Sequence, residues 1–270
     1  MLHKPTDLIQ FLNENNIRPK KALSQNFLID QNIVKKFVNA LDINEDDIVL
    51  EIGPGPGVLT FEVLKKAKEV IVIEKDTFYA NNLKKQNILN LKVFEDDFLT
   101  FDFNKIKKNK KIKVISSLPY SITAPIISKL LKNNLLFSKI VIMLQKEVAN
   151  RICSKKDLKT YSSFTIFVNY FSKPSIIHNV SKNCFFPAPK VDSTILSLEP
   201  KNLKKPLDDD FFNFVRLSFN QRRKKITSSL KNHVNKQNLI SALKELNLDL
   251  NARAENLSLE NYINLYKYLY

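Results

Sequence analysis

The residues best suited to chemistry form a glycine-rich segment in the first quarter of the chain, Glu51-Ile-Gly-Pro-Gly-Pro-Gly57. It lies between an apolar run and a stretch with helical periodicity, so we expect a turn from a strand into a helix. Glycines permit a tight turn and close approach of a ligand to the backbone, and the following helix N-terminus favours polar or anionic groups. Alone, the segment fits a nucleotide site or an ordinary tight turn, and its spacing is not that of dinucleotide binders.

Acidic residues end the next two apolar runs. Glu74 ends the second run, where a carboxylate can accept hydrogen bonds from both ribose hydroxyls of a nucleoside. Asp97 follows the third run and precedes Phe98, so the acid could accept the exocyclic amino group of a bound adenine while Phe98 lines the ring. Asp102 is the alternative acid. Together with the glycine-rich turn, these residues predict a site for an adenosine moiety.

A short Ser117-Leu-Pro-Tyr120 segment closes the fourth apolar run. Pro119 holds Leu118 extended. The turn then presents Ser117, two backbone carbonyls and the Tyr120 ring at the carboxyl edge of a sheet, where α/β proteins bind ligands. An aromatic face beside hydrogen-bond acceptors suits a planar base with an exocyclic amino group. A Pro-Tyr surface turn without a ligand is the alternative.

The elements that must position these residues alternate between strand-like and helix-like patterns. Five short runs are too apolar for half-exposed strands and too short for helices, which is typical of parallel strands buried on both faces: 48–52, 70–74, 91–94, 112–116 and 140–144. Helical patterns occur at 31–41, 58–66, 77–85 and 124–131. Asp30 and Asp76 are the expected N-caps of the first and third. The alternation predicts an open, doubly wound α/β sheet.

The pattern changes after residue 160. Strand-like runs at 165–171, 175–180 and 193–198 predict an antiparallel addition to the sheet edge. A charged, proline-containing stretch at 199–206 is the expected linker. Helical patterns follow at 208–219, 223–233, 239–246 and 259–269. We therefore expect an α/β domain over residues 1–200 and a small all-α domain over residues 201–270.

Composition limits the class of protein. The chain has 270 residues, with 43 Lys and Arg against 27 Asp and Glu, a formal net charge of +16. This charge favours a nucleic-acid partner, because cations attract phosphate and release its counterions. No apolar run approaches the roughly 18 residues of a membrane helix, and the N-terminus does not read as a signal peptide. Two cysteines indicate a reducing compartment, and the histidines and cysteines lack metal-ligand spacing, so we expect a cytoplasmic protein without metal.

Glycine is strongly depleted. The chain contains only three, Gly53, Gly55 and Gly57, where average usage predicts about 19. Abundant Lys, Asn and Ile with scarce Gly, Ala and Trp are typical of an AT-rich genome, which also accounts for part of the lysine excess. Glycines kept under such a bias are expected at backbone positions that side chains cannot occupy. The depletion therefore strengthens the prediction of a ligand site at the turn.

In this order, the motifs resemble the S-adenosylmethionine-dependent ribosomal RNA adenine dimethyltransferases. The resemblance covers nearly the whole chain and rests on Gln25-Asn-Phe-Leu28, Glu51–Gly57, Glu74, Asp97, Ser117–Tyr120, Leu144-Gln-Lys-Glu-Val-Ala149, Cys184-Phe-Phe-Pro-Ala-Pro-Lys-Val-Asp-Ser193 and Phe219-Asn-Gln-Arg-Arg-Lys224. It implies a Rossmann-like methyltransferase fold, catalytic over residues 1–200, with a small C-terminal all-α RNA-binding domain over 201–270. The implied activity is N6,N6-dimethylation of two adjacent adenosines in a 3′-terminal hairpin loop of 16S ribosomal RNA.

The resemblance also assigns roles to individual residues. The implied cofactor contacts are Gln25, Asn26, Leu28, Gly53, Gly55, Glu74, Asp97, Phe98 and Ser117. Tyr120 is implied to stack on the target adenine, opposite Phe185. We expect Ser117 and the Leu118 carbonyl to hold the N6 hydrogens and bias the nitrogen toward tetrahedral geometry. The family has Asn where Ser117 stands. Because a hydroxyl is shorter than an amide, the rate of methylation and the efficiency of the second methylation can differ from those of the family.

Basic clusters supply the expected RNA surface. Arg222, Arg223, Lys224 and Lys225 are the predicted RNA-binding residues, with Lys20-Lys21 and the run 105–113 as further clusters. A solvated charge run is the alternative for each cluster, and 105–113 is typical of a lysine-rich surface loop. We expect a monomer that acts on small-subunit ribosomal RNA within an immature 30S particle, away from membranes.

Two other functions stay open. A weakly active or inactive ribosome-assembly factor would bind RNA through the same surface, and Ser117 motivates this hypothesis. A 23S ribosomal RNA methylase giving macrolide resistance is the other, because Ser24 before Gln25 resembles that branch. Gln145-Lys-Glu-Val-Ala149 and Arg222-Arg-Lys224 resemble the small-subunit branch instead, which we favour.

Overall fold

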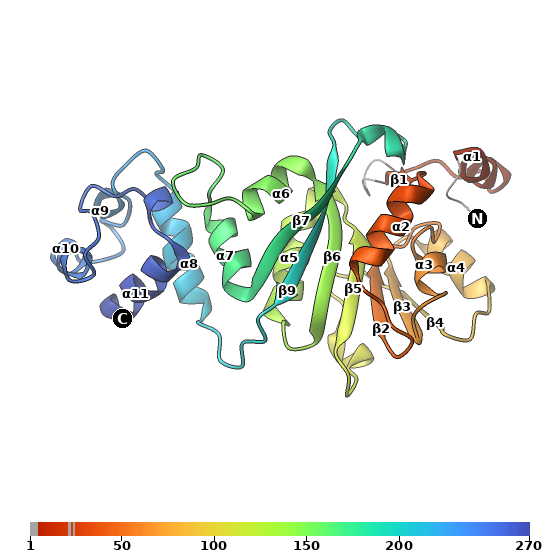
Figure 1. Ribbon diagram of the computed structural model, residues 1–270, viewed down its shortest axis with the longest axis horizontal. Coiled ribbons are helices and arrows are strands. Elements are labelled where there is room, and N and C mark those ends of the chain that lie inside the picture. The colour runs from red at the N-terminus through yellow and green to blue at the C-terminus, as the bar shows by residue number, and fades with distance from the viewer. Residues whose placement is uncertain (1–4, 21–22, 24) are drawn as a thin grey trace. The chain divides into compact units, whose positions relative to one another are not determined.

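The computed structural model describes residues 5–20, 23 and 25–270 (Figure 1). The chain forms two compact units: Met1–Ala149 with Lys173–Asn202, and Asn150–Ser172 with Leu203–Tyr270. We call them the sheet unit and the helical unit. The last boundary lies two residues from the expected one, but residues 150–172, expected in the first domain, belong to the helical unit. The division of catalysis and RNA binding between the units stays a prediction.

The sheet unit is built on a seven-stranded sheet with the order β4-β3-β2-β5-β6-β9-β7. The five parallel strands are β2 (Ile48–Ile52), β3 (Glu69–Glu74), β4 (Leu91–Glu95), β5 (Ile112–Ser117) and β6 (Phe137–Gln145). Strand β9 (Ser193–Pro200) pairs antiparallel with β6, and β7 (Ser172–Val180) lies at the edge. The expected parallel sheet with an antiparallel addition is confirmed.

Burial along the strands follows their place in the sheet. Every residue of β2 is buried, and β3 is buried from Val70 onward, because neighbouring strands and helices cover these central positions. Strand β4 has no buried residue. The expectation that all five runs are buried on both faces was therefore wrong for 91–94, since this strand forms the edge of the sheet.

Helices cover the sheet on both faces, with α2 in front of the strands and α5 behind them in the view of Figure 1. The helices of this part of the chain are α1 (Pro5–Glu14), α2 (Gln31–Ala40), α3 (Thr60–Val63), α4 (Thr77–Lys85), α5 (Thr123–Lys132) and α6 (Lys146–Ile152). The expected N-caps are confirmed: Asp30 accepts hydrogen bonds from the backbone of Asn32 and Ile33, and Asp76 accepts one from Phe78. Helix α3 is shorter than the expected 58–66.

A small second sheet lies beside the main one. Strand β1 (Phe27–Leu28) pairs antiparallel with β8 (Phe185–Phe186), with Leu28 opposite Phe185. The pairing brings together two motifs that are 157 positions apart in the chain. Phe27 also packs edge-on against the buried ring of Tyr79, with ring centroids 5.6 Å apart.

The helical unit has its own hydrophobic core. Its helices are α7 (Ser163–Phe171), α8 (Asp209–Phe219), α9 (Ile226–Ser229), α10 (Lys236–Glu245) and α11 (Leu259–Leu269). Buried aromatic rings at Phe211, Phe214 and Tyr262 lie at the centre of this core. No helix in the described part of the chain is long and apolar enough to cross a membrane.

Two predictions about this unit were wrong. The run 165–171 forms helix α7 instead of a strand, because Ser162 and Thr165 make a reciprocal capping box at its start and its apolar residues pack in the helical core. The expected helix 223–233 is reduced to Ile226–Ser229. The basic residues before it lie in a turn, and the Ile226 N–H donates to the Ala252 carbonyl instead of an intrahelical partner.

Candidate functional site

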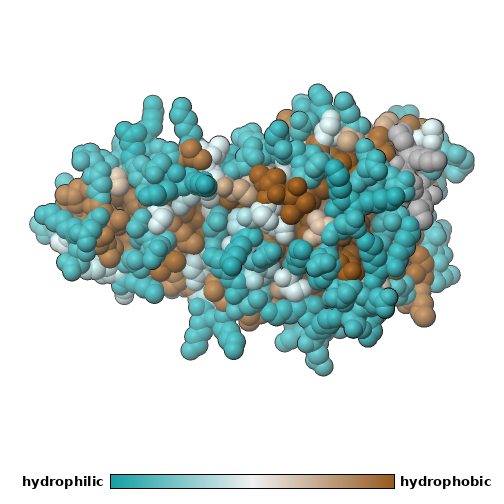
Figure 2. Space-filling view, viewed as in Figure 1, coloured by the Kyte–Doolittle hydropathy of each residue, from teal (hydrophilic) through white to brown (hydrophobic). Residues whose placement is uncertain are grey.

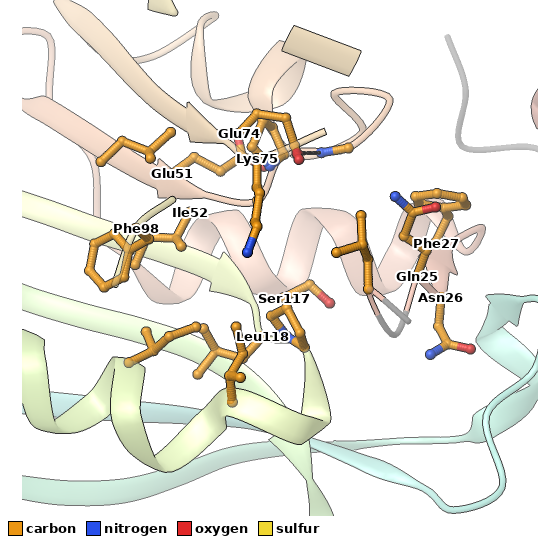
Figure 3. A pocket seen from close by; sticks show the side chains of 18 of the residues that line it. Gln25, Asn26, Phe27, Glu51, Ile52, Glu74, Lys75, Phe98, Ser117 and Leu118 are labelled. Atoms are coloured by element: carbon orange, nitrogen blue, oxygen red, sulfur yellow. Dashed lines mark hydrogen bonds between the residues drawn. The ribbon is translucent and has the colours of Figure 1, made fainter. Parts of the chain in front are cut away.

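One pocket opens at the carboxyl ends of β2, β3 and β5 and beside the loop that follows β4 (Figure 3). Its cavity volume is about 230 Å³. All twelve residues predicted for cofactor or catalysis line it: Gln25, Asn26, Leu28, Gly53, Gly55, Glu74, Asp97, Phe98, Ser117, Leu118, Tyr120 and Phe185. The structure therefore brings together residues from six separate segments, and their individual roles stay predictions.

The glycine-rich turn occupies backbone conformations that L side chains rarely adopt. Gly53, Gly55 and Gly57 have φ angles of +63°, +54° and +89°. A Cβ atom on Gly53 would meet nothing within 4 Å, whereas one on Gly57 would lie 2.8 Å from Phe61 Cε2. Gly53 therefore leaves open space beside the backbone in the pocket, which fits a ligand, and Gly57 permits close packing of the following helix.

Glu74 is held in place by two backbone N–H groups. Its Oε2 accepts a hydrogen bond from Gly55 at 2.9 Å and its Oε1 accepts one from Asp76 at 2.7 Å. Burial raises the pKa of Glu74 and the Asp76 carboxylate adds to this, while the hydrogen bonds oppose it. Each carboxylate oxygen has a second lone pair, so Glu74 can still accept ribose hydroxyls from the pocket.

Asp76 has more contacts than the cap predicted from the sequence. Its Oδ2 accepts hydrogen bonds from Gln25 Nε2 at 3.1 Å and from Lys20 Nζ at 2.9 Å. The carboxylate is nearly fully buried. Asp76 therefore ties the end of β3 to the segment that carries Gln25 and Asn26. Sequence reasoning missed this link, because Gln25 is 51 positions away and no local pattern marks the pair.

Asp97, rather than the alternative Asp102, lies in the pocket. Asp97 Oδ1 accepts from the Leu99 backbone at 2.8 Å, and Oδ2 forms a 2.8 Å ion pair with Lys75. The Lys75 ammonium is the main reason that the pKa of Asp97 lies below its ordinary value. Asp102 caps the 3-10 turn Phe103–Ile106 and does not line the pocket. Lys75 does line it, which the sequence did not indicate.

The Ser117–Tyr120 segment is anchored at both ends. The Leu118 N–H donates to the Met143 carbonyl at 2.9 Å, and the Tyr120 hydroxyl lies 2.7 Å from Ser193 Oγ on β9. Because Ser193 is fully buried, this hydrogen bond fixes one edge of the Tyr120 ring. Figure 3 shows the Ser117 hydroxyl on the pocket side of the segment. The arrangement offers an aromatic face beside polar acceptors.

Glu51 is a buried acid on the pocket wall. It is 2% exposed, and its Oε2 accepts a 2.6 Å hydrogen bond from Thr60 Oγ1. Burial, with a smaller contribution from the Glu74 charge, raises the pKa of Glu51 to about 8, and the Thr60 hydrogen bond opposes the shift. The side chain is therefore largely neutral at pH 7.

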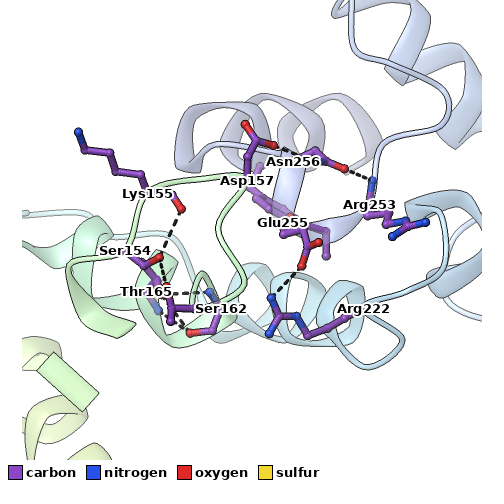
Figure 4. A network of polar contacts seen from close by, with 12 residues as sticks. Ser154, Lys155, Asp157, Ser162, Thr165, Arg222, Arg253, Glu255 and Asn256 are labelled. Atoms are coloured by element: carbon purple, nitrogen blue, oxygen red, sulfur yellow. Dashed lines mark hydrogen bonds and ion pairs between the residues drawn. The ribbon is translucent and has the colours of Figure 1, made fainter. Parts of the chain in front are cut away.

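The four predicted RNA-binding residues differ in whether their side chains contact the rest of the protein; Figure 4 shows the contact of Arg222. Arg222 Nη2 forms a 2.8 Å ion pair with Glu255, and Lys225 Nζ donates to Asn251 Oδ1. Arg223 and Lys224 are exposed, and neither side chain has an ion-pair partner among the described residues. These two are therefore available to phosphate, whereas Arg222 and Lys225 hold the turn to the segment before α11.

The other basic clusters are largely paired with acids. In the run 105–113, ion pairs join Lys105 to Asp96, Lys108 to Glu69, and both Lys110 and Lys113 to Asp47. This pairing matches the alternative of a surface run. Lys20 pairs with Asp76, and Lys21 and Ser24 lie outside the described residues. Figure 2 shows hydrophilic residues over much of the visible face.

Metal chemistry receives no support from the side chains. Within residues 5–20, 23 and 25–270, no cluster of three or more His, Cys, Asp or Glu side chains could hold a metal ion. The pocket instead combines an open glycine backbone, two anchored carboxylates and aromatic faces. This set fits an adenosine group, because the carboxylates can accept its hydroxyl and amino hydrogens.

Known proteins match this chain over most or all of its length. A family model described as ribosomal RNA adenine dimethylase matches residues 16–270. A protein of Protochlamydia amoebophila named ribosomal RNA small subunit methyltransferase A is 43% identical, covering 100% of this chain and 98% of that protein. A protein of the same name from Clostridium botulinum (strain Loch Maree / Type A3) is 40% identical, covering 94% of each.

Solved structures show the same fold. A dimethyladenosine transferase from Plasmodium falciparum has a TM-score of 0.78 and 31% identity, covering 88% of this chain and 95% of that one. The 23S rRNA methyltransferase ErmE has a TM-score of 0.69 and 24% identity, covering 90% and 99%. At that identity the second likeness concerns the fold alone. The expected Rossmann-like fold of methyltransferases is thereby confirmed.

Proposed function

Because this chain belongs to the ribosomal RNA adenine dimethylase family, we propose that its pocket dimethylates N6 of two adjacent adenosines in small-subunit ribosomal RNA, with S-adenosylmethionine as methyl donor. The observation that supports this most strongly is the gathering of the glycine-rich turn, Glu74, Asp97 and Ser117–Tyr120 in one pocket. The relatives named small subunit methyltransferase A favour this substrate over 23S ribosomal RNA.

The residues present fit the cofactor. The vacant space beside Gly53 gives room for a ligand against the backbone, Glu74 faces the pocket with free lone pairs for ribose hydroxyls, and Asp97 can accept the adenine amino hydrogens. When bound, S-adenosylmethionine would supply a sulfonium methyl group, whose carbon an adenine nitrogen could accept in line as the neutral thioether leaves. Lys75, now paired with Asp97, must share that carboxylate with the adenine.

The chain's own residues act on the target base mainly by positioning. Ser117 and the Leu118 carbonyl hold the N6 hydrogens and draw the nitrogen lone pair out of conjugation with the ring. Tyr120 stacks on the flipped adenine, which recovers about 1–3 kcal/mol of the unstacking cost. Orientation of this kind supplies about 7–11 kcal/mol in well-aligned models. No strong base is needed beforehand, because the N6 proton becomes acidic once the nitrogen is alkylated.

The substrate form and assembly state belong to the same proposal. Every residue of the pocket comes from the sheet unit of one chain, so a monomer suffices. The substrate we propose is an immature 30S particle, because the target base must be flipped out of its stack to reach the pocket. Exposed Arg223 and Lys224 then add phosphate contacts from the helical unit.

The test is methylation of purified subunits. The protein is incubated with methyl-labelled cofactor and with undermethylated 30S or 50S subunits, and digested RNA is analysed by mass spectrometry. We expect N6,N6-dimethyladenosine in 16S ribosomal RNA only. Binding to 30S without methylation would favour the assembly-factor function that Ser117 motivates. Methylation of 23S ribosomal RNA alone would favour the resistance methylase.

A further inference from the structure

The loop after β4 carries three pocket residues without regular secondary structure, Asp96, Asp97 and Phe98. Asp97 and Phe98 lie between β4 and the 3-10 turn at Phe103–Ile106. In the turn that follows, the backbone N–H groups of Thr100 and Phe101 donate hydrogen bonds to the Asp97 carbonyl. The side-chain position of Asp97 therefore depends on what holds the remainder of the loop.

Lys129, on helix α5, holds this loop in place. Its Nζ donates to the backbone carbonyls of Leu99 at 3.0 Å and Phe101 at 2.6 Å. The same ammonium lies 5.4 Å from the ring centroid of Phe98 and 5.1 Å from that of Phe103, within cation–π range. One cation thus contacts two backbone carbonyls and the Phe98 ring of this loop, and its removal would leave the two carbonyls without this donor.

The charges around Lys129 match this placement. Burial lowers the pKa of the ammonium, and the carboxylates of Asp97, Asp96 and Asp102 oppose the shift. Three acidic side chains of one loop thus favour the charged form of one partly buried cation. Lys129 does not line the pocket, so any effect on a ligand must pass through the loop.

We propose that Lys129 is a positioning residue for adenine recognition: it fixes the loop so that Asp97 and Phe98 meet the adenine of the cofactor. This inference rests on the proposed function, since it assumes that an adenosine group lies against Asp97. A cation on a helix that holds the recognition loop in place can contribute to ligand specificity without touching the ligand.

Lys105 is a matched control within the same region. It lies 5.3 Å from the Phe101 ring centroid and pairs with Asp96 at 3.3 Å, with about half of its side chain exposed. Like Lys129, it lies over an aromatic ring and near an acid of the loop, but among the described residues it donates no hydrogen bond to a loop carbonyl. Exposed contacts of this kind contribute little, so Lys105→Met should change ligand binding by less than about twofold.

The experiment compares two ligands that differ at the amino group. Wild type, Lys129→Met, Lys129→Arg and Lys105→Met are titrated with S-adenosylhomocysteine and with S-inosylhomocysteine, in which oxygen replaces the amino group. We expect Lys129→Met to lose about tenfold in affinity for the adenosyl ligand and to lose most of the preference for it. Lys129→Arg should keep part of the affinity and part of the preference. Lys105→Met should match wild type in both quantities.

The outcomes separate positioning from general stability. If Lys129→Met weakens both ligands equally, or binds both like wild type, the inference is overturned. If that variant does not melt cooperatively, Lys129→Gln, which keeps an N–H donor without the charge, is measured in its place with the same expected loss of preference. A wild-type protein that binds neither ligand would contradict the proposed function instead.

Discussion

The pocket of the sheet unit and the basic turn of the helical unit, to which we assign cofactor and RNA binding, are built in different ways. The pocket fixes its carboxylates with backbone hydrogen bonds, as at Glu74. The helical unit has 16 Lys and Arg against 8 Asp and Glu in 91 residues, while the sheet unit has 27 against 19 in 179. Both carry a net charge of +8, so the charge density is about twice as high in the helical unit. A ligand pocket depends on single atoms, whereas a phosphate surface depends on the number of free cations.

The largest expected effect tests the dependence of the pocket on single atoms. In Gly53→Ala the new methyl group enters the space beside the backbone where the ligand is proposed to lie. We expect at least about a 100-fold loss of affinity for S-adenosylhomocysteine, equivalent to about 2.8 kcal/mol, by calorimetric titration. The melting temperature should fall by only a few degrees, because the left-handed conformation costs alanine about 1–2 kcal/mol.

Gly57→Ala is the matched control, because its Cβ would lie 2.8 Å from Phe61 and 3.0 Å from Leu83. It should lower the melting temperature more than Gly53→Ala does, while the folded protein keeps more of its ligand affinity. Unchanged affinity in Gly53→Ala would refute the role assigned to this turn.

A smaller effect tests the charge dependence of the helical unit. Replacing both Arg223 and Lys224 by alanine should weaken binding to 30S RNA about tenfold near physiological salt and reduce the salt slope by about 2. Affinity for S-adenosylhomocysteine should stay the same. Filter binding over a series of salt concentrations measures both quantities.

Arg222→Met separates structure from RNA contact in the same turn. It leaves Glu255 without its ion-pair partner, so we expect a lower melting temperature and a smaller change of the salt slope than in the double variant. A double variant with the wild-type slope would show that these two cations do not contact RNA.

The smallest expected effect is a pH dependence of the pocket. Burial raises the pKa of Glu51 to about 8, from an unfolded value of 4.5. The folded state therefore holds a proton that the unfolded state has lost, and the contribution of Glu51 to stability falls as the pH rises from about 4.5 to 8. Glu51→Gln removes this titration, while its side-chain oxygen can still accept from Thr60. The melting temperature of Glu51→Gln should therefore rise relative to wild type as the pH increases across this range. A constant difference between pH 5 and 9 would contradict the raised pKa.

Local signals explain why much of the sheet unit could be predicted from the sequence. Strand ends, glycines and caps such as Asp30 and Asp76 act on neighbouring backbone, so their positions can be read from the chain. The acid alternatives at 97 and 102 could not be separated, because both follow β4 and only the fold decides which one lines the pocket.

Contacts between distant residues could not be predicted. Tyr120 and Ser193 are 73 positions apart, and Arg222 and Glu255 are 33 apart. Packing brings each pair together, and no spacing marks them. Helix α7 was missed for a related reason: its apolar, β-branched and aromatic residues are typical of strands, but burial in the helical core and the Ser162 cap decide its structure.

The most direct test of the central claim is a crystal structure of the protein with S-adenosylhomocysteine bound. We expect the ligand in the pocket, with backbone contact at Gly53, ribose hydroxyls on the Glu74 carboxylate and the adenine amino group on Asp97. A ligand bound elsewhere, or an empty pocket at saturating ligand, would contradict the assignment of this pocket to the cofactor.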